Sequence, residues 1–171
     1  RILSKEKQSV ALIDCDVEEP NVMNFIPHRL QKEREVKEFR PAINTDKCIF
    51  CKKCVEYCNY HAIFCEPELH YIKVIEDLCH GCAACSWACK SGAIGFASKK
   101  VGMVSLYTHQ DKVCLAEGRM EIGNHSAVST IKAAKAAFDT SEYQYIIYDS
   151  PPGTSCPFMQ TVQYSDYVIL V

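Results

Sequence analysis

The sequence has no long hydrophobic run, and its longest apolar stretches, VALI and YVILV, are only as long as a strand. A helix needs about 20 apolar residues to cross a bilayer, so no transmembrane segment is predicted. The sequence also has no apolar leader of the secretory type. Its formal net charge is only −2 at pH 7, and without a basic block it does not indicate a nucleic-acid partner.

Cysteine, by contrast, is abundant, with 12 in 171 residues. Small secreted domains use many cysteines as disulfides, but a chain of this length can bury an ordinary core without them. Most of the thiols crowd into two short segments, CIFCKKCVEYC at residues 48–58 and CHGCAACSWAC at residues 79–89. Such close spacing suits a compact inorganic ligand better than cross-links between distant segments, so disulfides are the weaker interpretation.

Both segments have the spacing C-x2-C-x2-C-x3-C, which favours iron–sulfur clusters over zinc. A structural zinc site usually takes two C-x2-C pairs separated by a longer loop. Three thiolates at i, i+3 and i+6 can instead surround one 4Fe–4S cluster, whose fourth ligand comes from elsewhere in the chain. The sequence therefore predicts two 4Fe–4S clusters, and a zinc ribbon is the alternative.

The ligand sets follow from the resemblance of this spacing to two-cluster bacterial ferredoxins, in which the fourth cysteine of each run binds the other cluster. The resemblance implies a first cluster held by Cys48, Cys51, Cys54 and Cys89, and a second held by Cys79, Cys82, Cys85 and Cys58. The remaining thiols are interpreted as small buried residues, and they are Cys15, Cys65, Cys114 and Cys156. Exposed clusters of this type are oxygen-sensitive, so a reducing cytoplasm is the expected location.

A departure from the ferredoxin pattern follows the last cysteine of each run. The proline that usually stands there is replaced by Asn59 and Lys90, which alters a turn but no thiol. A shift of 31 residues still superposes all the cysteines of the first run on those of the second, which indicates an internal duplication. We therefore expect an inserted α+β domain of the bacterial-ferredoxin type over residues 42–97, with small strands at 62–65, 71–77 and 93–96.

The segments on either side of this insert read as an α/β domain. Three apolar runs that contain or adjoin acids predict strands covered on both faces, as in a parallel sheet, at residues 10–16, 143–149 and 166–171. Residues 102–108 and 112–122 read as a hairpin. Open α/β sheets bind ligands at the carboxyl ends of their strands, where several of these acids lie.

Helices are predicted between these strands. The amphipathic stretch at 124–142 has Asn124 or Ser126 as its cap, and residues 156–165 form the next crossover helix. The mixed charged run at 32–38 reads as a solvated linker or helix face.

Together, LIDCDVEEPN (12–21), EGRMEIGNHSAV (117–128) and IIYDSPPGTSCP (146–157) resemble P-loop ATPases of the MinD/ParA/Mrp class. The resemblance is narrowest to the subgroup that carries a 4Fe–4S ferredoxin domain inserted after switch I. It implies an α/β fold of the deviant-Walker P-loop NTPase type, with a partial, doubly wound and mostly parallel sheet. The ATPase domain is then expected in two pieces, residues 1–41 and 98–171.

The resemblance also implies roles for the acids at the strand ends. Asp149 matches the Walker B acid, which holds Mg²⁺ directly or through water. Asp16 matches the switch I acid that positions Mg²⁺ and the attacking water, and Asp14 is its neighbour in the same motif. The switch II turn, which responds to the γ-phosphate, matches Pro151, Pro152 and Gly153. The expected cofactors are thus ATP and Mg²⁺, and the expected assembly is an ATP-dependent homo- or heterodimer.

The Walker A motif G-x-x-x-x-G-K-S/T is absent from the sequence. The resemblance places it upstream of residues 10–16, and residues 1–9 read as the tail of a preceding helix. We therefore expect an internal fragment of a longer protein, one that does not grip ATP phosphates by itself. The main hypothesis is an ATPase whose nucleotide state is coupled to electron transfer or cluster handling, with a redox protein or an iron–sulfur client as partner. The alternatives are a ferredoxin-like electron-transfer module without ATPase activity and a carrier for cluster assembly.

Overall fold

The computed structural model describes residues 9–109, 113–124 and 127–171. The chain divides into two compact units, one of Arg1–Val36 with Val101–Val171 and the other of Lys37–Lys100. The helix tail predicted at the start of the chain and the alternative cap Ser126 lie outside the described residues.

Two long strands, β2 (Arg29–Ile43) and β5 (Ile94–His109), contribute residues to both units. The first unit adds β1 (Val10–Asp14), η1 (Val22–Phe25), β6 (Val113–Met120), α4 (Val128–Lys135), η5 (Thr140–Glu142), β7 (Tyr145–Asp149) and α5 (Cys156–Val162). The second unit adds η2 (Thr45–Lys47), α2 (Lys53–Glu56), β3 (Ile63–Glu66), η3 (Pro67–Leu69), β4 (Tyr71–Val74), η4 (Glu76–Leu78) and α3 (Ala84–Ala88).

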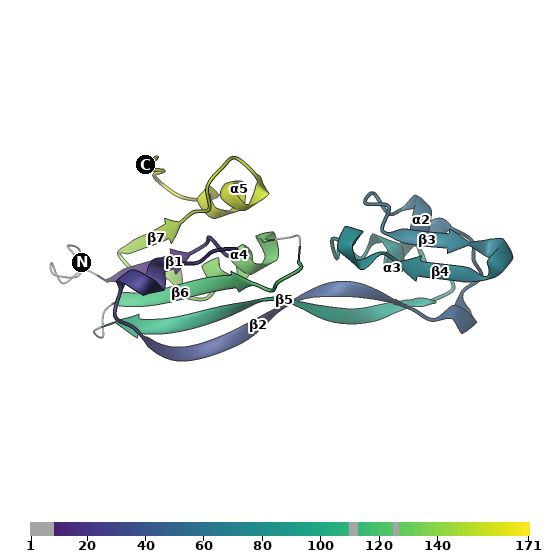
Figure 1. Cartoon of the computed structure of the whole chain (residues 1–171), viewed down its shortest axis with the longest axis horizontal. Helices are drawn as coiled ribbons and strands as arrows, with labels where there is room; N and C mark the ends of the chain where they lie inside the picture. Colours follow the sequence, from purple (N-terminus) through teal and green to yellow (C-terminus); the bar gives the residue numbers. More distant parts are fainter. Residues whose placement is uncertain (1–8, 110–112, 125–126) are drawn as a thin grey trace. The chain divides into compact units, whose positions relative to one another are not determined.

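The larger sheet has the strand order β2-β5-β6-β1-β7, and β1 lies between β6 and β7 in Figure 1. β1 runs parallel to both of these neighbours, whereas β6 runs antiparallel to β5. The central position of β1 follows from its sequence VALID, whose residues are mostly buried, as a strand covered on both faces requires. The predicted hairpin is confirmed, because β5 and β6 pair in register from Gly102 opposite Met120 to His109 opposite Val113.

Helix α4 packs on β6 and β1, and α5 packs against α4 and β7. Ile131 of α4 is fully buried in the core with Ile13 and Val104 of the sheet. Gly118 of β6 allows this close packing, because a Cβ atom there would lie 3.3 Å from Cβ of Ala134 in α4 and 2.8 Å from Cγ1 of Val17.

The C-terminal end of α5 is tied to α4 by a half-buried cation. The ammonium group of Lys135 donates hydrogen bonds to the backbone carbonyls of Gln160, Thr161 and Gln163. A positive charge at this end of a helix satisfies carbonyls that have no partner within the helix.

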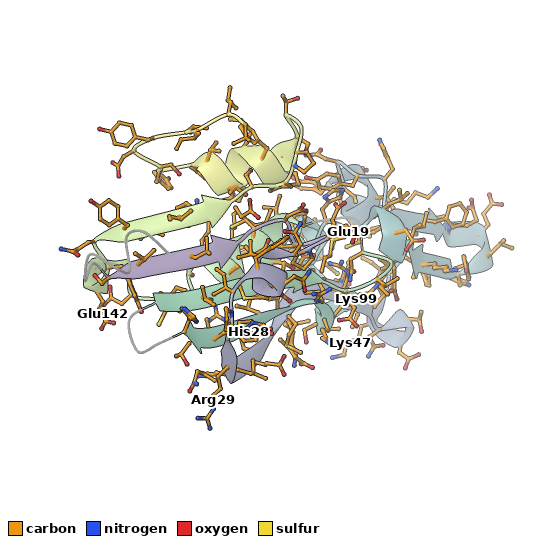
Figure 2. All side chains as sticks on the ribbon, turned by 60° about the vertical axis from the view of Figure 1, so that its left-hand side comes forward. Glu19, His28, Arg29, Lys47, Lys99 and Glu142 are labelled. Carbon is orange, nitrogen blue, oxygen red and sulfur yellow. The ribbon has the colours of Figure 1, made fainter. Side chains whose placement is uncertain are left out.

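Three predictions for the first unit differ from the structure. The charged run at 32–38 is the middle of β2, whose residues are mostly exposed apart from Val36. Among the described strands, β2 pairs with β5 alone, and charged side chains suit such a position at the edge of a sheet. Figure 2 shows His28 and Arg29 near the start of this strand.

The predicted helix at 124–142 is shorter at both ends, because α4 runs from Val128 to Lys135. Its N-cap residue is Ala127, so the predicted cap Asn124 is wrong. A local turn follows it, in which the carboxylate of Asp139 accepts hydrogen bonds from the N–H and hydroxyl of Ser141. Asp and Ser side chains that bond nearby backbone groups compete with helix formation. The predicted strand at 166–171 is also absent, since these residues pair with no strand in the described part of the chain.

The 31-residue repeat is visible in the backbone of the second unit. Left-handed conformations recur at equivalent positions: Phe50 and Gly81, Lys52 and Ala83, and His61 and Gly92. Helices α2 and α3 begin at equivalent residues, as do β3 and β5. The packed cluster of buried residues in this unit likewise consists of two equivalent pairs, Cys54 with Cys85 and Ile63 with Ile94. The two halves are therefore similar in conformation as well as in sequence.

The two halves also exchange equivalent backbone hydrogen bonds. The N–H of Asn44 donates to the carbonyl of Ala93 at 2.8 Å, and the N–H of Ile75 donates to the carbonyl of Ala62 at 2.7 Å. The segment before each cysteine loop is thus bonded to the segment after the other loop.

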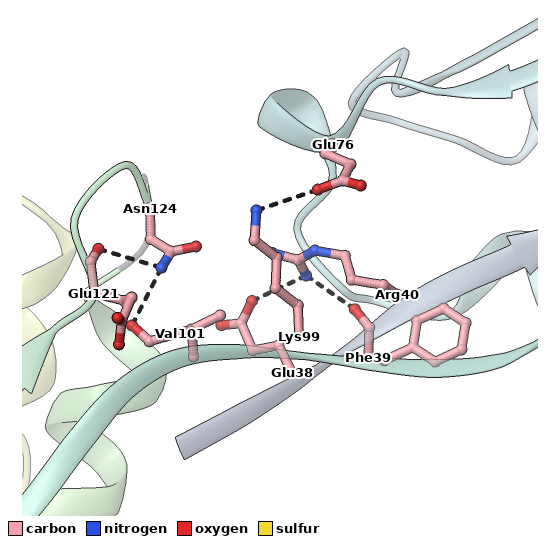
Figure 3. Close-up of polar contacts among 8 residues, drawn as sticks. All are labelled: Glu38, Phe39, Arg40, Glu76, Lys99, Val101, Glu121 and Asn124. Atoms are coloured by element: carbon pink, nitrogen blue, oxygen red, sulfur yellow. Dashed lines mark hydrogen bonds and ion pairs between the residues drawn. The ribbon is translucent and has the colours of Figure 1, made fainter. Parts of the chain in front are cut away.

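Polar contacts lie within β2 and between β5 and the segment before the second cysteine loop. Nη1 of Arg40 donates to the carboxylate of Glu38 and to the carbonyl of Phe39, as Figure 3 shows. Lys99 pairs with Glu76 at 3.2 Å, just before the second loop. Gly81 lies close to this arrangement, because a Cβ atom there would be 2.9 Å from the carbonyl oxygen of Phe39. A side chain at this position would therefore push the second loop away from β2.

Candidate metal centre

The first cysteine loop and the end of the second enclose a cavity, which we call cavity I. Its lining contains Cys48, Cys51 and Cys54 of the first loop and Cys89, which follows α3. The empty space is about 330 Å³, including its open mouth. These four thiols are the ligand set that the ferredoxin resemblance implies for the first cluster.

The second loop encloses a similar cavity, which we call cavity II. Its lining contains Cys79, Cys82 and Cys85 of the second loop and Cys58, which follows α2. The empty space is about 320 Å³, measured in the same way. These are the four cysteines that the resemblance implies for the second cluster. Ligation of iron itself stays a prediction.

Local backbone geometry explains how each loop turns around its cavity. A 3-10 turn, η2 or η4, ends immediately before the first cysteine of each loop. Figure 2 labels Lys47, the last residue of η2. Lys52 and Ala83 then adopt the left-handed conformation directly before α2 and α3. Alternation of right- and left-handed residues turns successive backbone N–H groups toward one side, which suits anionic iron–sulfur sites.

The thiols within each cavity differ in exposure. Cys51 and Cys82 are exposed, whereas Cys54 and Cys85 are buried. Burial, helped by the nearby thiols of Cys65 and Cys48, raises the pKa of Cys54 to about 11. Burial likewise raises the pKa of Cys85. In the absence of iron these two groups therefore favour the neutral thiol, and ligation requires that they lose a proton.

The fourth thiol of each cavity receives hydrogen bonds. Burial opposes the ionisation of Cys89, but the hydroxyl of Ser91 and backbone N–H groups together lower its pKa. The Sγ of Cys58 accepts a hydrogen bond from the N–H of Ala62 at 3.3 Å. Hydrogen bonds to sulfur stabilise negative charge at an iron–sulfur site.

The residues present fit iron–sulfur clusters. All twelve cysteines are free thiols in the structure. In the described part of the chain, no group of three or more His, Cys, Asp or Glu side chains is placed to hold a single metal ion. A 4Fe–4S cluster does not need such convergence, because its four thiolates bind four different irons. Apolar side chains complete the linings, among them Ile72 and Ile94 in cavity I and Phe39 and Ile63 in cavity II.

Sequence reasoning missed one thiol at this site. Cys65, interpreted as an ordinary buried residue, is indeed buried but lines cavity I with the four predicted ligands. The alternation along β3, in which Ile63 and Cys65 are buried and Phe64 is exposed, is the signal that could have placed it on the cluster side.

The acids of the first unit gather where β1 and β7 end. Asp14 and Asp149 are opposite each other in these parallel strands. Asp14 is fully buried, and its carboxylate accepts hydrogen bonds from the N–H groups of Asp16, Asn21 and Val22. It therefore holds the loop that follows β1. Burial nevertheless raises its pKa, with a contribution from Asp149.

The other residues matched to nucleotide binding lie near this strand end. Asp16 and Asp149 are half-buried, and burial together with Asp16 raises the pKa of Asp149. Pro151, Pro152 and Gly153 form a turn between β7 and α5, with Gly153 at a φ of 92°. Their roles toward ATP stay predictions.

The other three cysteines lie in the first unit. Cys15 is fully buried after β1, and burial raises its pKa to about 12. Cys114 lies on β6, and Cys156 is exposed at the start of α5, so it is not the buried residue expected from the sequence.

Comparison with known proteins supports the iron–sulfur interpretation. Residues 41–64 and 72–95 each match a family described as a 4Fe–4S binding domain. Together these matches cover both cysteine loops. No solved structure gives a significant match to the chain.

Two relatives match nearly the whole chain, and both are uncharacterized proteins of Methanocaldococcus jannaschii. One is 30% identical over all of this chain and 59% of its own length, and the other is 29% identical over 97% of this chain and 59% of its own length. The chain thus spans less than two thirds of the length of these two relatives. Pyruvate synthase subunit PorD of Methanothermobacter marburgensis is 33% identical over 42% of this chain and 83% of its own length.

In the described part of the chain, no helix is both long and apolar enough to cross a membrane. The family matches cover the two cysteine runs whose thiols surround cavities I and II. The chain therefore contains an iron–sulfur module of two ferredoxin-like 4Fe–4S repeats.

Proposed function

We propose that this chain transfers single electrons through two 4Fe–4S clusters, one in each cavity. The observation that carries the proposal is the arrangement of four thiols around each of two equivalent cavities, within repeats that match a 4Fe–4S binding domain. This is the ferredoxin-like module that the sequence left as an alternative, and the comparisons support it better than the ATPase hypothesis.

A bound cluster supplies a site that takes up and releases one electron without forming or breaking a covalent bond. The residues of the chain hold and shield that site. Thiolates bind the irons, while apolar neighbours such as Phe50 and Ile72 in cavity I reduce contact with water. The exposure of Cys51 and Cys82 leaves one side of each cavity open to another protein.

The proposed partner is an oxidoreductase protein. PorD is named as a subunit of pyruvate synthase, so a relative of the iron–sulfur region belongs to an oxidoreductase assembly. By analogy, an oxidoreductase would lose one electron to this chain, and a second protein would accept that electron.

Anaerobic purification followed by iron and sulfide analysis tests this proposal. We expect about eight irons and eight sulfides per chain, together with EPR signals of 4Fe–4S clusters after reduction. The clusters should survive repeated cycles of reduction and reoxidation. Stoichiometric zinc without sulfide would contradict the proposal. Rapid transfer of iron and sulfide to an apo-protein would favour the assembly carrier instead.

We also propose a second function, ATP binding, for a longer protein that contains this chain. Its support is the in-register placement of Asp14 and Asp149 at the ends of two parallel strands, with Asp16 close enough to affect the pKa of Asp149. Acids at such strand ends suit Mg²⁺ and phosphate chemistry. An ATP-dependent dimer belongs to this second proposal.

Equilibrium binding of Mg-ATP to the product of the complete gene tests the second function. Asp149→Asn should weaken binding or hydrolysis by about tenfold or more, because it removes a carboxylate charge near Mg²⁺. Asp166→Asn, at an exposed position, is the matched control and should have little effect. A complete protein that binds no nucleotide, or an unchanged Asp149→Asn variant, would contradict this function.

A further inference from the structure

Cavities I and II have equivalent backbones but different charges. The 31-residue shift that superposes the cysteines also pairs Lys52 with Ala83 and Lys53 with Ala84, and all four residues line their cavities. The lining of cavity II, within the described part of the chain, contains no lysine or arginine. Cavity I therefore carries basic side chains where cavity II carries methyl groups.

Conformation does not account for this difference. Lys52 has φ and ψ of 61° and 3°, and Ala83 has 62° and 5°. Both residues stand directly before a short helix. A non-glycine residue in this region is strained, so neither side chain is favoured by the backbone. The duplicated loop thus keeps the same geometry while its charge changes.

Lys52 contributes more net positive charge to cavity I than Lys53 does. Lys53 pairs with Glu56 at 2.7 Å, and the carboxylate offsets part of its positive charge. Lys52 follows the expected ligand Cys51 and lines cavity I together with Cys48 and Cys65. Its positive charge therefore belongs to the lining of cavity I.

A second difference between the cavities concerns the residue beside the fourth thiol. In cavity I the hydroxyl of Ser91 lies 3.5 Å from the Sγ of Cys89. The equivalent residue in cavity II is Tyr60, whose ring instead stacks on that of His80 with the centroids 3.9 Å apart. Cavity I thus gains a hydroxyl beside its fourth thiol, whereas cavity II gains an aromatic ring.

Both differences affect the reduction potential of a cluster in the cavity. A cluster gains one negative charge when it accepts an electron, and nearby positive charge or hydrogen bonds to sulfur stabilise the reduced form. We propose that the cluster in cavity I has the higher reduction potential of the two, and that Lys52 sets this order. An electron donated by a redox partner is therefore held mainly by the cluster in cavity I. This inference depends on the proposed electron-transfer function.

Redox titration monitored by EPR tests the order of the two potentials. Variants that each keep one cluster assign the signals: Cys79→Ala retains the cluster of cavity I, and Cys48→Ala retains that of cavity II. The cluster in Cys79→Ala should have the higher midpoint potential. The opposite order, or equal values, would overturn the proposal.

Reciprocal substitutions then test the role of Lys52 in the otherwise unchanged chain. Lys52→Ala should lower the higher midpoint potential and leave the lower one in place. Ala83→Lys should raise the lower potential and narrow the gap. Lys73→Ala is the control, because Lys73 is exposed on β4 and outside the lining of both cavities.

The outcomes separate this inference from the function on which it depends. Full iron and sulfide content with midpoints that do not respond to Lys52→Ala would overturn the inference alone. A shift of equal size in Lys73→Ala would do the same, because it would show a general effect of surface charge. A chain that binds no clusters would overturn the proposed function and the inference together.

Discussion

Replacing Cys89 by alanine should disrupt the cluster of cavity I, although Cys89 belongs to the second cysteine run. Its thiol lines the same cavity as Cys48. We therefore expect Cys89→Ala and Cys48→Ala to lose the same EPR signal and about half of the iron, because each leaves one complete set of four thiols. Cys58→Ala and Cys79→Ala should lose the other signal for the same reason.

Iron and sulfide analysis with EPR of the reduced variants measures this effect. Cys156→Ala is the matched control, since Cys156 is an exposed thiol of the first unit and should retain the full iron content. If Cys89→Ala instead lost the signal that Cys79→Ala loses, each run would bind its own cluster. The crosswise ligand sets would then be wrong.

Removal of iron should unfold the second unit and leave the first unit folded. The packed cluster of buried residues in Lys37–Lys100 is small, with four members, and two of them are the expected ligands Cys54 and Cys85. A domain of this size is only marginally stable from apolar burial, and binding of a structural metal can supply about 10 kcal/mol or more. The first unit keeps a separate core around Ile13 and Ile131.

Hydrogen exchange measured by mass spectrometry can follow both units in one experiment. After chelation of iron under reducing conditions, peptides containing β3 and β4 should lose their protection, because among the strands that the structure describes these two pair only with each other. Peptides containing β1 and α4 should keep theirs and act as the internal control. Retained protection in β3 and β4 would show that the apo-unit folds without clusters.

Several elements were predictable because their sequences carry a local signal. The apolar runs VALID and YIIYD form β1 and β7, and the segment that begins at Cys156 forms α5. β2 was not predictable in this way, because its charged residues show no buried face apart from Val36. Its extended form depends on hydrogen bonding to β5, which is distant in the sequence.

The sequence by itself determined the number and spacing of the thiols, and the ferredoxin pattern supplied the expected crosswise sets. Only the tertiary structure decided which other groups surround them. Cys65 and Ser91 enter cavity I because β3 and the turn after α3 approach the first loop. Lys52 and Ala83 are ordinary loop residues in the sequence, yet equivalent folding places them at equivalent cavities. The physical reason is that thiol spacing is local, whereas the charge around a cavity depends on residues that meet only after folding.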